Sequence, residues 1–172
     1  EKSPRMFWGI DFGVASYMTA ILMCENTAGE VYVFDEIGLQ NSNTFELAKL
    51  MQLKGRGLPV YPDPAGKART SNSTKSDHKI LQEAGFTVIA KKANPTQKDR
   101  LNALNKMLED ATGKVKLFIN PKCKNTIRDL ELCTMENGQI LKTETLSHFL
   151  DALCYPVDYR YGFKGQAKAI EW

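Results

Sequence analysis

Three apolar segments at the start of the chain limit its possible folds more than any other feature of the sequence. They cover residues 5–12, 17–24 and 31–37, and only short polar or small-residue turns separate them. Residues 13–16 are too few for the long crossover that parallel strands require, but they suit a hairpin. We therefore expect the chain to begin as an antiparallel meander of three strands.

Beyond residue 40 the pattern becomes an alternation of helices and short strands. A helix is expected from about residue 44, followed by strands at 58–61, 86–90 and 115–119 and further helices at 75–84, 97–110, 122–135 and 146–155. A hairpin turn is expected at residues 136–139. This order predicts an α/β fold whose mixed sheet has three antiparallel strands followed by parallel strands, with helices on its faces.

Several helix boundaries have local signals. Asn43 is placed to cap the first helix, and Glu46 completes a capping box. Pro121 suits the first turn of the fourth helix, and Pro156 should kink or end the last helix. The apolar stripe of the first helix is expected to consist of Phe45, Leu47, Leu50 and Met51.

Composition narrows the class of protein. The 172 residues fit one domain, and the 42% hydrophobic and 25% charged residues are typical of a globular chain. No apolar run approaches the ~20 residues of a membrane span, and the polar start is unlike a signal peptide. The scattered cysteines form no CxxC pair, so we expect reduced thiols buried as small hydrophobes.

The basic residues are clustered although the net charge is only +3. The clusters are Lys67, Arg69, Lys75 and Lys79; Lys91, Lys92, Lys98 and Arg100; and Lys122, Lys124 and Arg128. The first lies in or beside the loop at residues 64–74, where Lys67, Arg69 and Lys75 could contact DNA phosphates without sequence preference. A solvated loop explains them equally well.

Two acids end or interrupt apolar strands. Asp11 lies between Ile10 and Phe12, where an unpaired charge would be costly, so it must be paired, hydrogen-bonded or bound to a metal. Asp63 ends the strand at 58–61, and Pro64 favours an extended backbone there. If the two strands are parallel neighbours, both acids lie at one sheet edge. The alternatives are a cap at the turn for Asp11 and a turn start for Asp63.

A third acid lies on the last predicted helix. His148, Asp151 and Tyr155 are spaced to share one helix face, while neighbouring leucines and a phenylalanine provide an apolar surface. The alternative is a solvated face without function. Together, Asp11, Asp63 and Asp151 form the kind of carboxylate set that holds two Mg²⁺ or Mn²⁺ ions in phosphodiesterases.

Other acids are weaker candidates. Glu36 could lie near the carboxylates as an occasional ligand or as a partner of one, although an exposed acid at a strand end is the simpler interpretation. Asp77 and Asp99 lie near predicted helix starts, where acids favour the helix dipole. We interpret both as structural.

These segments together resemble the C-terminal nuclease domain of the large terminase subunit of tailed double-stranded DNA bacteriophages, which is a ribonuclease-H-like domain. The matching pieces are WGIDFG at 8–13, VYVFDEIG at 31–38, YPDPAGKA at 61–68 and SHFLDALCYPVDY at 147–159. They occur in the family's order, and the last is the most specific. Two features depart from the family pattern: Cys154 stands where Arg is frequent, and the loop at 64–74 is longer and more basic.

The resemblance implies a single nuclease domain over residues 1–172 that cuts concatemeric viral DNA in the host cytoplasm during packaging. Asp11, Asp63 and Asp151 would bind Mg²⁺ or Mn²⁺, with His148 as a further catalytic-site residue. In the family, the partners are double-stranded DNA, an ATPase domain, the small terminase subunit and the portal. The ATPase domain is expected to be absent from this chain, since no GxxxxGK[ST] motif occurs.

Three other functions fit parts of the pattern. An actin-like ATPase or sugar kinase could start with GIDFGVAS, but it needs a second lobe for which 172 residues leave no room. A Holliday-junction resolvase or transposase core would use the same carboxylate chemistry. A non-catalytic DNA-binding module would leave the three aspartates unrelated.

Overall fold

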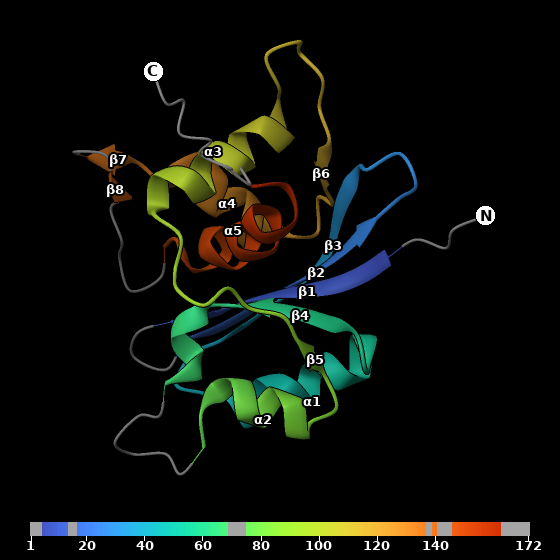
Figure 1. The fold of residues 1–172 in the computed structure, drawn as a ribbon, viewed down its shortest axis with the longest axis vertical. Helices are drawn as coiled ribbons and strands as arrows, with labels where there is room; N and C mark the ends of the chain where they lie inside the picture. Colours follow the sequence, from blue (N-terminus) through green and yellow to red (C-terminus); the bar gives the residue numbers. More distant parts are fainter. Residues whose placement is uncertain (1–4, 14–16, 69–74, 137–138, 141–145, 163–172) are drawn as a thin grey trace, which may run out of the picture.

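The protein is described by a computed structural model that covers residues 5–13, 17–68, 75–136, 139–140 and 146–162. A mixed β-sheet forms the middle layer (Figure 1). Helices α1 and α2 cover one face of the sheet, and helices α3, α4 and α5 cover the other. The predicted mixed sheet flanked by helices is confirmed.

The main sheet has the strand order β5-β4-β1-β2-β3-β6. Strands β1, β2 and β3 form the predicted antiparallel meander, while β4 pairs in parallel with β1, β5 with β4, and β6 with β3. Observed and predicted strand ends differ by at most a few residues. The bounds are β1 Arg5–Phe12, β2 Met18–Glu25, β3 Val31–Leu39, β4 Pro59–Pro62, β5 Thr87–Val88 and β6 Leu117–Ile119.

The helices lie near their predicted positions. Their bounds are α1 Thr44–Gly55, α2 Asp77–Glu83, α3 Gln97–Leu108, α4 Lys124–Leu132 and α5 His148–Tyr161, with a short 3-10 helix, η2, at Pro64–Lys67. A small hairpin of β7 (Met135–Glu136) and β8 (Gln139–Ile140) matches the predicted turn, whose central residues lie outside the described chain. No helix in the described segments is both long and apolar enough to cross a membrane.

Helix α1 confirms its predicted cap but not its whole stripe. The Asn43 side chain accepts hydrogen bonds from two backbone N–H groups of the first turn, at 3.0 and 3.1 Å. Leu47 and Met51 are fully buried, whereas Phe45 and Leu50 are exposed. The predicted stripe was wrong at these two positions because the face of α1 that packs against the sheet includes Ala48 instead.

Alternating residues of β1 fill two separate cores. Trp8 and Ile10 pack with α1 and α2, while Phe7 packs with α3, α4 and α5. Asp11 has the same parity as Phe7 and therefore faces the α5 side. The sequence period of two thus decides which face of the sheet receives the first acid.

Of the two predicted effects of Pro156, an end of the helix is wrong, because α5 continues to Tyr161. Proline cannot donate to the carbonyl of Ala152, the residue four positions earlier. That carbonyl faces Gly9 of β1, where a Cβ would lie only 2.1 Å from the Ala152 oxygen. Tight packing of α5 on β1 therefore stabilises the helix across the proline, and it requires glycine at position 9.

Two smaller predictions also differ from the structure. Pro121 precedes α4 instead of lying in its first turn, because the helix begins at Lys124. All four cysteines are free thiols, as predicted, but only Cys123 and Cys154 are buried; Cys24 and Cys133 are half-buried.

Candidate active site

Two of the three candidate aspartates occupy matching positions on neighbouring parallel strands. The last paired residues of β1 and β4 are Ile10 and Pro62. Asp11 follows Ile10, and Asp63 follows Pro62. The Asp63 N–H donates to the Ile10 carbonyl at 2.9 Å and extends the ladder to this point. Strands of one sheet lie about 4.8 Å apart, so the two acids are neighbours, as the sequence predicted.

Asp11 is held by the helix that packs above it. Only 5% of the residue is exposed, and its Oδ2 lies 2.9 Å from Nδ1 of His148. The His148 ring lies beside the ring of Tyr17, and a Cβ on Gly13 would lie 2.7 Å from it. Glycine at position 13 therefore gives His148 the space to reach Asp11.

Asp63 combines a strand end with a turn start, so both interpretations of its sequence context hold. Its Oδ1 accepts a hydrogen bond from the Ala65 N–H at 2.8 Å and caps η2. Its backbone carbonyl lies 2.8 Å from Nε2 of His78, which must carry the proton because a carbonyl can only accept. The contact with the buried His78 was not foreseen, and it fixes the backbone of Asp63.

Asp151 comes from α5 and is 1% exposed. Its Oδ1 forms an ion pair with Nη1 of Arg100 on α3 at 2.8 Å. Arg100 is itself 7% exposed, and its guanidinium carbon lies 4.9 Å from the centre of the Tyr155 ring. The solvated-face interpretation of His148, Asp151 and Tyr155 is wrong, since all three are buried.

The charges of Asp63 and Asp151 act on Asp11. Burial raises the pKa of Asp11, and the negative charges of Asp151 and Asp63 raise it further, against the opposing hydrogen bond from His148. Burial also raises the pKa of Tyr155, with Asp63 and Asp11 adding to the effect. Such a concentration of negative charge in a buried place favours binding of a cation.

The residues present fit a hard divalent ion in their chemistry. Carboxylate oxygens are the ligands that Mg²⁺ and Mn²⁺ prefer. Thr19 pairs with Asp11 across β1 and β2, and its buried hydroxyl has no hydrogen-bond partner within the described chain, which leaves it available to a ligand. However, no three His, Cys, Asp or Glu side chains of the described residues are close enough together to hold an ion as they stand.

Comparison with known protein families decides the classification. Residues 8–159 match the family described as the terminase RNaseH-like domain, which is most of the chain. The chain belongs to this family. Comparison of the terminase domain with curated proteins gave no match.

Solved structures of large terminases share the fold of this terminase domain. The P22 large terminase nuclease domain has a TM-score of 0.71 and 17% identity, over 94% of this chain and 86% of that one. The large terminase of a thermophilic bacteriophage has a TM-score of 0.65 and 20% identity, over 91% and 40% of the two chains. The nuclease domain of bacteriophage SPP1 g2p, solved with bound Mn, has a TM-score of 0.62 and 16% identity, over 90% and 86%.

These likenesses confirm the ribonuclease-H-like fold. The terminase domain spans less than half of the large terminase chain from the thermophilic bacteriophage. At position 154, where the family frequently has Arg, this chain has a buried cysteine. The cation that pairs with Asp151 is instead Arg100 of α3. Arg100 repeats with Ala103, Leu104 and Met107 on the buried face of α3, so an arginine within an apolar stripe was the sequence signal for it.

Glu36 supports the fold next to this site instead of offering it an oxygen. Its two carboxylate oxygens accept four hydrogen bonds, of 2.8–2.9 Å, from the backbone and side chains of Asn125 and Thr126 at the start of α4. It is neither an exposed acid nor oriented as a ligand. Asp77 and Asp99 lie in the first turns of α2 and α3, as expected.

Asp129 was not foreseen and supports the site helix directly. It is fully buried on α4, and its Oδ2 accepts from the N–H groups of Phe149 at 2.9 Å and Leu150 at 3.4 Å, in the first turn of α5. Glu36 therefore caps α4, and Asp129 on α4 caps α5. These two caps, one half-buried and one buried, connect β3 to the helix that carries His148 and Asp151.

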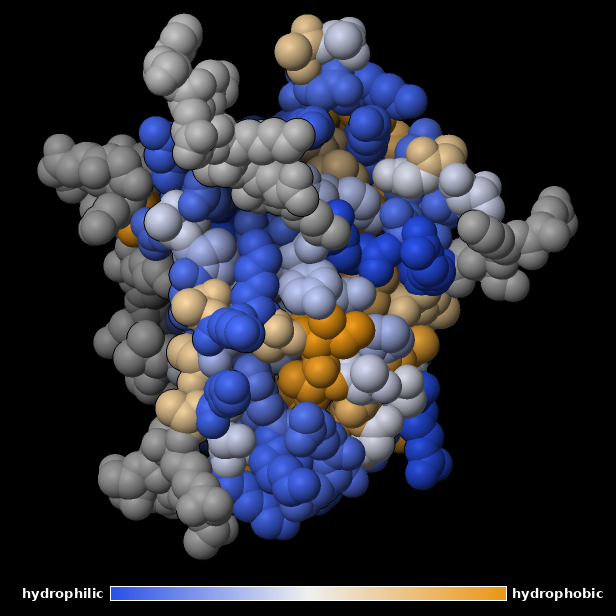
Figure 2. Space-filling model, viewed as in Figure 1, coloured by the Kyte–Doolittle hydropathy of each residue, from blue (hydrophilic) through white to orange (hydrophobic). Residues whose placement is uncertain are grey.

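The predicted DNA-contacting residues are only partly described. Lys67 is exposed at the end of η2, four residues after Asp63. Lys75 is exposed and pairs with Glu83 at 2.6 Å, whereas Arg69 lies outside the described residues. The face in Figure 2 is mainly hydrophilic, apart from a hydrophobic area over β5.

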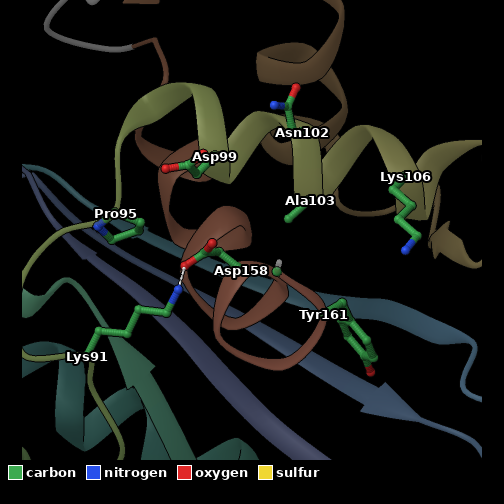
Figure 3. Close-up of a pocket in the computed structure, with 9 residues that line it drawn as sticks. Lys91, Pro95, Asp99, Asn102, Ala103, Lys106, Asp158 and Tyr161 are labelled. Atoms are coloured by element: carbon green, nitrogen blue, oxygen red, sulfur yellow. Dashed lines mark hydrogen bonds and ion pairs between the residues drawn. The ribbon is translucent and has the colours of Figure 1, made fainter. Parts of the chain in front are cut away.

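A cavity of the described residues lies away from the three aspartates. It has a volume of about 650 Å³ and lies between α3, the end of α5 and the segment at 91–95. In Figure 3, Lys91 and the buried Asp158 point toward one another across its edge and form an ion pair. Its mixed charges select no ligand class, so the carboxylates remain the candidate site.

Proposed function

We propose that this domain is a metal-dependent endonuclease that hydrolyses DNA phosphodiester bonds. The proposal is supported by two observations: Asp11 and Asp63 follow paired positions of β1 and β4, and the negative charges of Asp151 and Asp63 both raise the pKa of the buried Asp11. Family membership supports the same function. Asp11 and Asp151 are buried, and a buried carboxylate is costly unless a cation compensates it.

Asp11, Asp63 and Asp151 would hold two Mg²⁺ or Mn²⁺ ions. Bound ions of this kind supply an activated water and stabilise the leaving oxygen. The chain itself orients two of the ligands, because one oxygen of each is held by a donor: His148 for Asp11 and the Ala65 N–H for Asp63. Such supporting hydrogen bonds fix ligand geometry at metal sites.

The substrate would be double-stranded DNA, bound with little sequence preference. Lys67, Arg69 and Lys75 follow Asp63 in the chain and would contact phosphates. In the whole protein the domain would act with an ATPase domain, the small terminase subunit and the portal, and cut concatemeric DNA in the host cytoplasm. The greater length of the large terminase from the thermophilic bacteriophage supports a separate motor domain.

A plasmid-nicking assay with Mn²⁺ or Mg²⁺ tests the proposal. Wild-type protein should nick and linearise plasmid, and EDTA should stop it. Asp11→Asn and Asp151→Asn should each reduce cutting by about 10³-fold or more, because each removes a charged ligand. Asp110→Asn is a matched control, since this partly exposed acid lies beyond the end of α3 and accepts hydrogen bonds from Thr112 and Lys114 of its own loop.

Circular dichroism must show that each variant is folded. Cutting retained in both Asp11→Asn and Asp151→Asn, or cutting by wild-type protein in EDTA, would refute the mechanism. Loss of cutting in Asp110→Asn as well would show that the assay reports stability and not the site.

A further inference from the structure

Arg100 is a buried cation at the place where the proposed metal centre would have one of its ligands. Its Nη1 lies 2.8 Å from Oδ1 of Asp151, and both side chains are nearly inaccessible to water. We propose that Arg100 balances the charge of Asp151 when no divalent ion is bound, and that an incoming ion must displace it. This inference rests on the proposed metal-dependent function.

The contacts of Arg100 are directed at the acid cluster. Asp151 is its ion-pair partner, Tyr155 of the same helix lies under its guanidinium, and the charge of Asp63 also acts on it. Its buried Nε has no hydrogen-bond partner within the described part of the chain. A guanidinium with an unsatisfied buried donor is therefore held there mainly by the negative charge around it.

The arrangement also explains why the acids do not form a ready-made cage. Asp151 is oriented toward α3, Asp11 is held by His148, and no group of three possible ligands among the described residues is close enough to bind one ion. An ion that used Asp151 would bring two positive charges next to the guanidinium. Their repulsion in a buried place is large, so the ion pair and the metal-bound state compete.

Arg100 therefore lowers the affinity of the site for divalent ions. The role differs from that of a supporting residue that only orients Asp151. Loss of an orienting residue weakens metal binding, commonly 10–100-fold, whereas loss of a competing cation strengthens it. The sign of the change separates the two roles.

Mn²⁺ binding to the purified protein provides the test, measured by isothermal titration and by the electron paramagnetic resonance signal of free Mn²⁺. Arg100→Gln should bind Mn²⁺ about tenfold more tightly than wild type, because one competing charge is gone. Arg100→Lys keeps the charge and should stay closer to wild type. Arg160→Gln is the matched control, since it removes another arginine paired with a buried acid, Glu25.

Equal or weaker Mn²⁺ binding by Arg100→Gln would overturn the inference while leaving the nuclease proposal intact. Tightening of the same size in Arg100→Lys or Arg160→Gln would also overturn it. Absence of Mn²⁺ binding in both wild type and Arg100→Gln would refute the metal centre itself, and the inference with it.

A second measurement does not depend on the variant folding. Crystals of wild-type protein soaked in Mn²⁺ should show the Arg100–Asp151 pair separated beyond the ~4 Å limit of an ion pair. An intact pair beside a bound Mn²⁺ ion would overturn the inference.

Discussion

Replacement of Asp129 by alanine should destabilise the domain more than any surface cap does. The side chain is fully buried, and its Oδ2 accepts hydrogen bonds from the N–H groups of Phe149 at 2.9 Å and Leu150 at 3.4 Å. Alanine leaves both donors without this acceptor in the first turn of α5. The perturbation therefore acts at the start of the helix that carries His148 and Asp151.

The size of the effect can be estimated from these two bonds. A hydrogen bond to a charged group contributes roughly 1.5–3 kcal/mol, and the longer bond to Leu150 contributes less than the shorter one. The ion pair with the half-exposed Arg128 adds little because water screens it. We expect the free energy of unfolding to fall by about 3 kcal/mol, which lowers Tm by roughly 6–12 °C in a domain of this size.

Urea and thermal unfolding followed by circular dichroism measure this change. Asp129→Asn retains a neutral acceptor and should cost about half as much. Asn43→Ala removes the exposed cap of α1 and should cost ~1 kcal/mol. If Asp129→Ala costs no more than Asn43→Ala at an unchanged m-value, the buried cap does not stabilise α5 as reasoned.

Two further predictions test packing and thiol chemistry. Gly9→Ala places a Cβ 2.1 Å from the Ala152 oxygen and 2.8 Å from Cγ of Pro156. Urea unfolding should therefore show a free energy of unfolding that is lower by about 3 kcal/mol or more. A decrease below ~1 kcal/mol would contradict the close approach. Burial raises the pKa of Cys154 to about 12, so at pH 8 only ~10⁻⁴ of this thiol is ionised to thiolate. Its rate of reaction with a thiol label should therefore rise about tenfold per pH unit as the pH approaches that pKa. Peptide mapping after timed thiol labelling should find the half-buried Cys24 modified well before Cys154, and equal rates in folded protein would exclude this.

Local patterns were sufficient for most secondary structure. The three-strand meander, the Asn43 cap and the order of helices and strands follow from hydrophobic period and turn residues, which act over a few neighbours. Strand and helix ends shifted by a few residues because hydrogen bonds to neighbouring elements decide them. The errors at Phe45 and Leu50 arose because the sheet, not the helix, decides which part of a stripe is covered.

The continuation of α5 through Pro156 could not be predicted locally. Proline disfavours a helix interior in isolation, and only the packing of Ala152 on Gly9 outweighs that preference. The capping roles of Glu36 and Asp129 could not be predicted from the sequence either, because their partners lie 89 and 20 residues away in the chain. A hydrogen bond to a residue so distant in the chain produces no periodic pattern in the sequence.

The sequence by itself determined the fold class, the family resemblance and the identity of three aspartates that could share a site, since type, spacing and strand position are local properties. Tertiary structure alone decided that Asp11 and Asp63 lie on neighbouring strands, that α5 buries Asp151 where its charge acts on Asp11, and that Arg100 of α3 pairs with Asp151. The physical reason is the range of the forces involved. Helix and strand patterns arise between near neighbours, whereas burial and charge pairing depend on which distant segments the folded chain brings into contact.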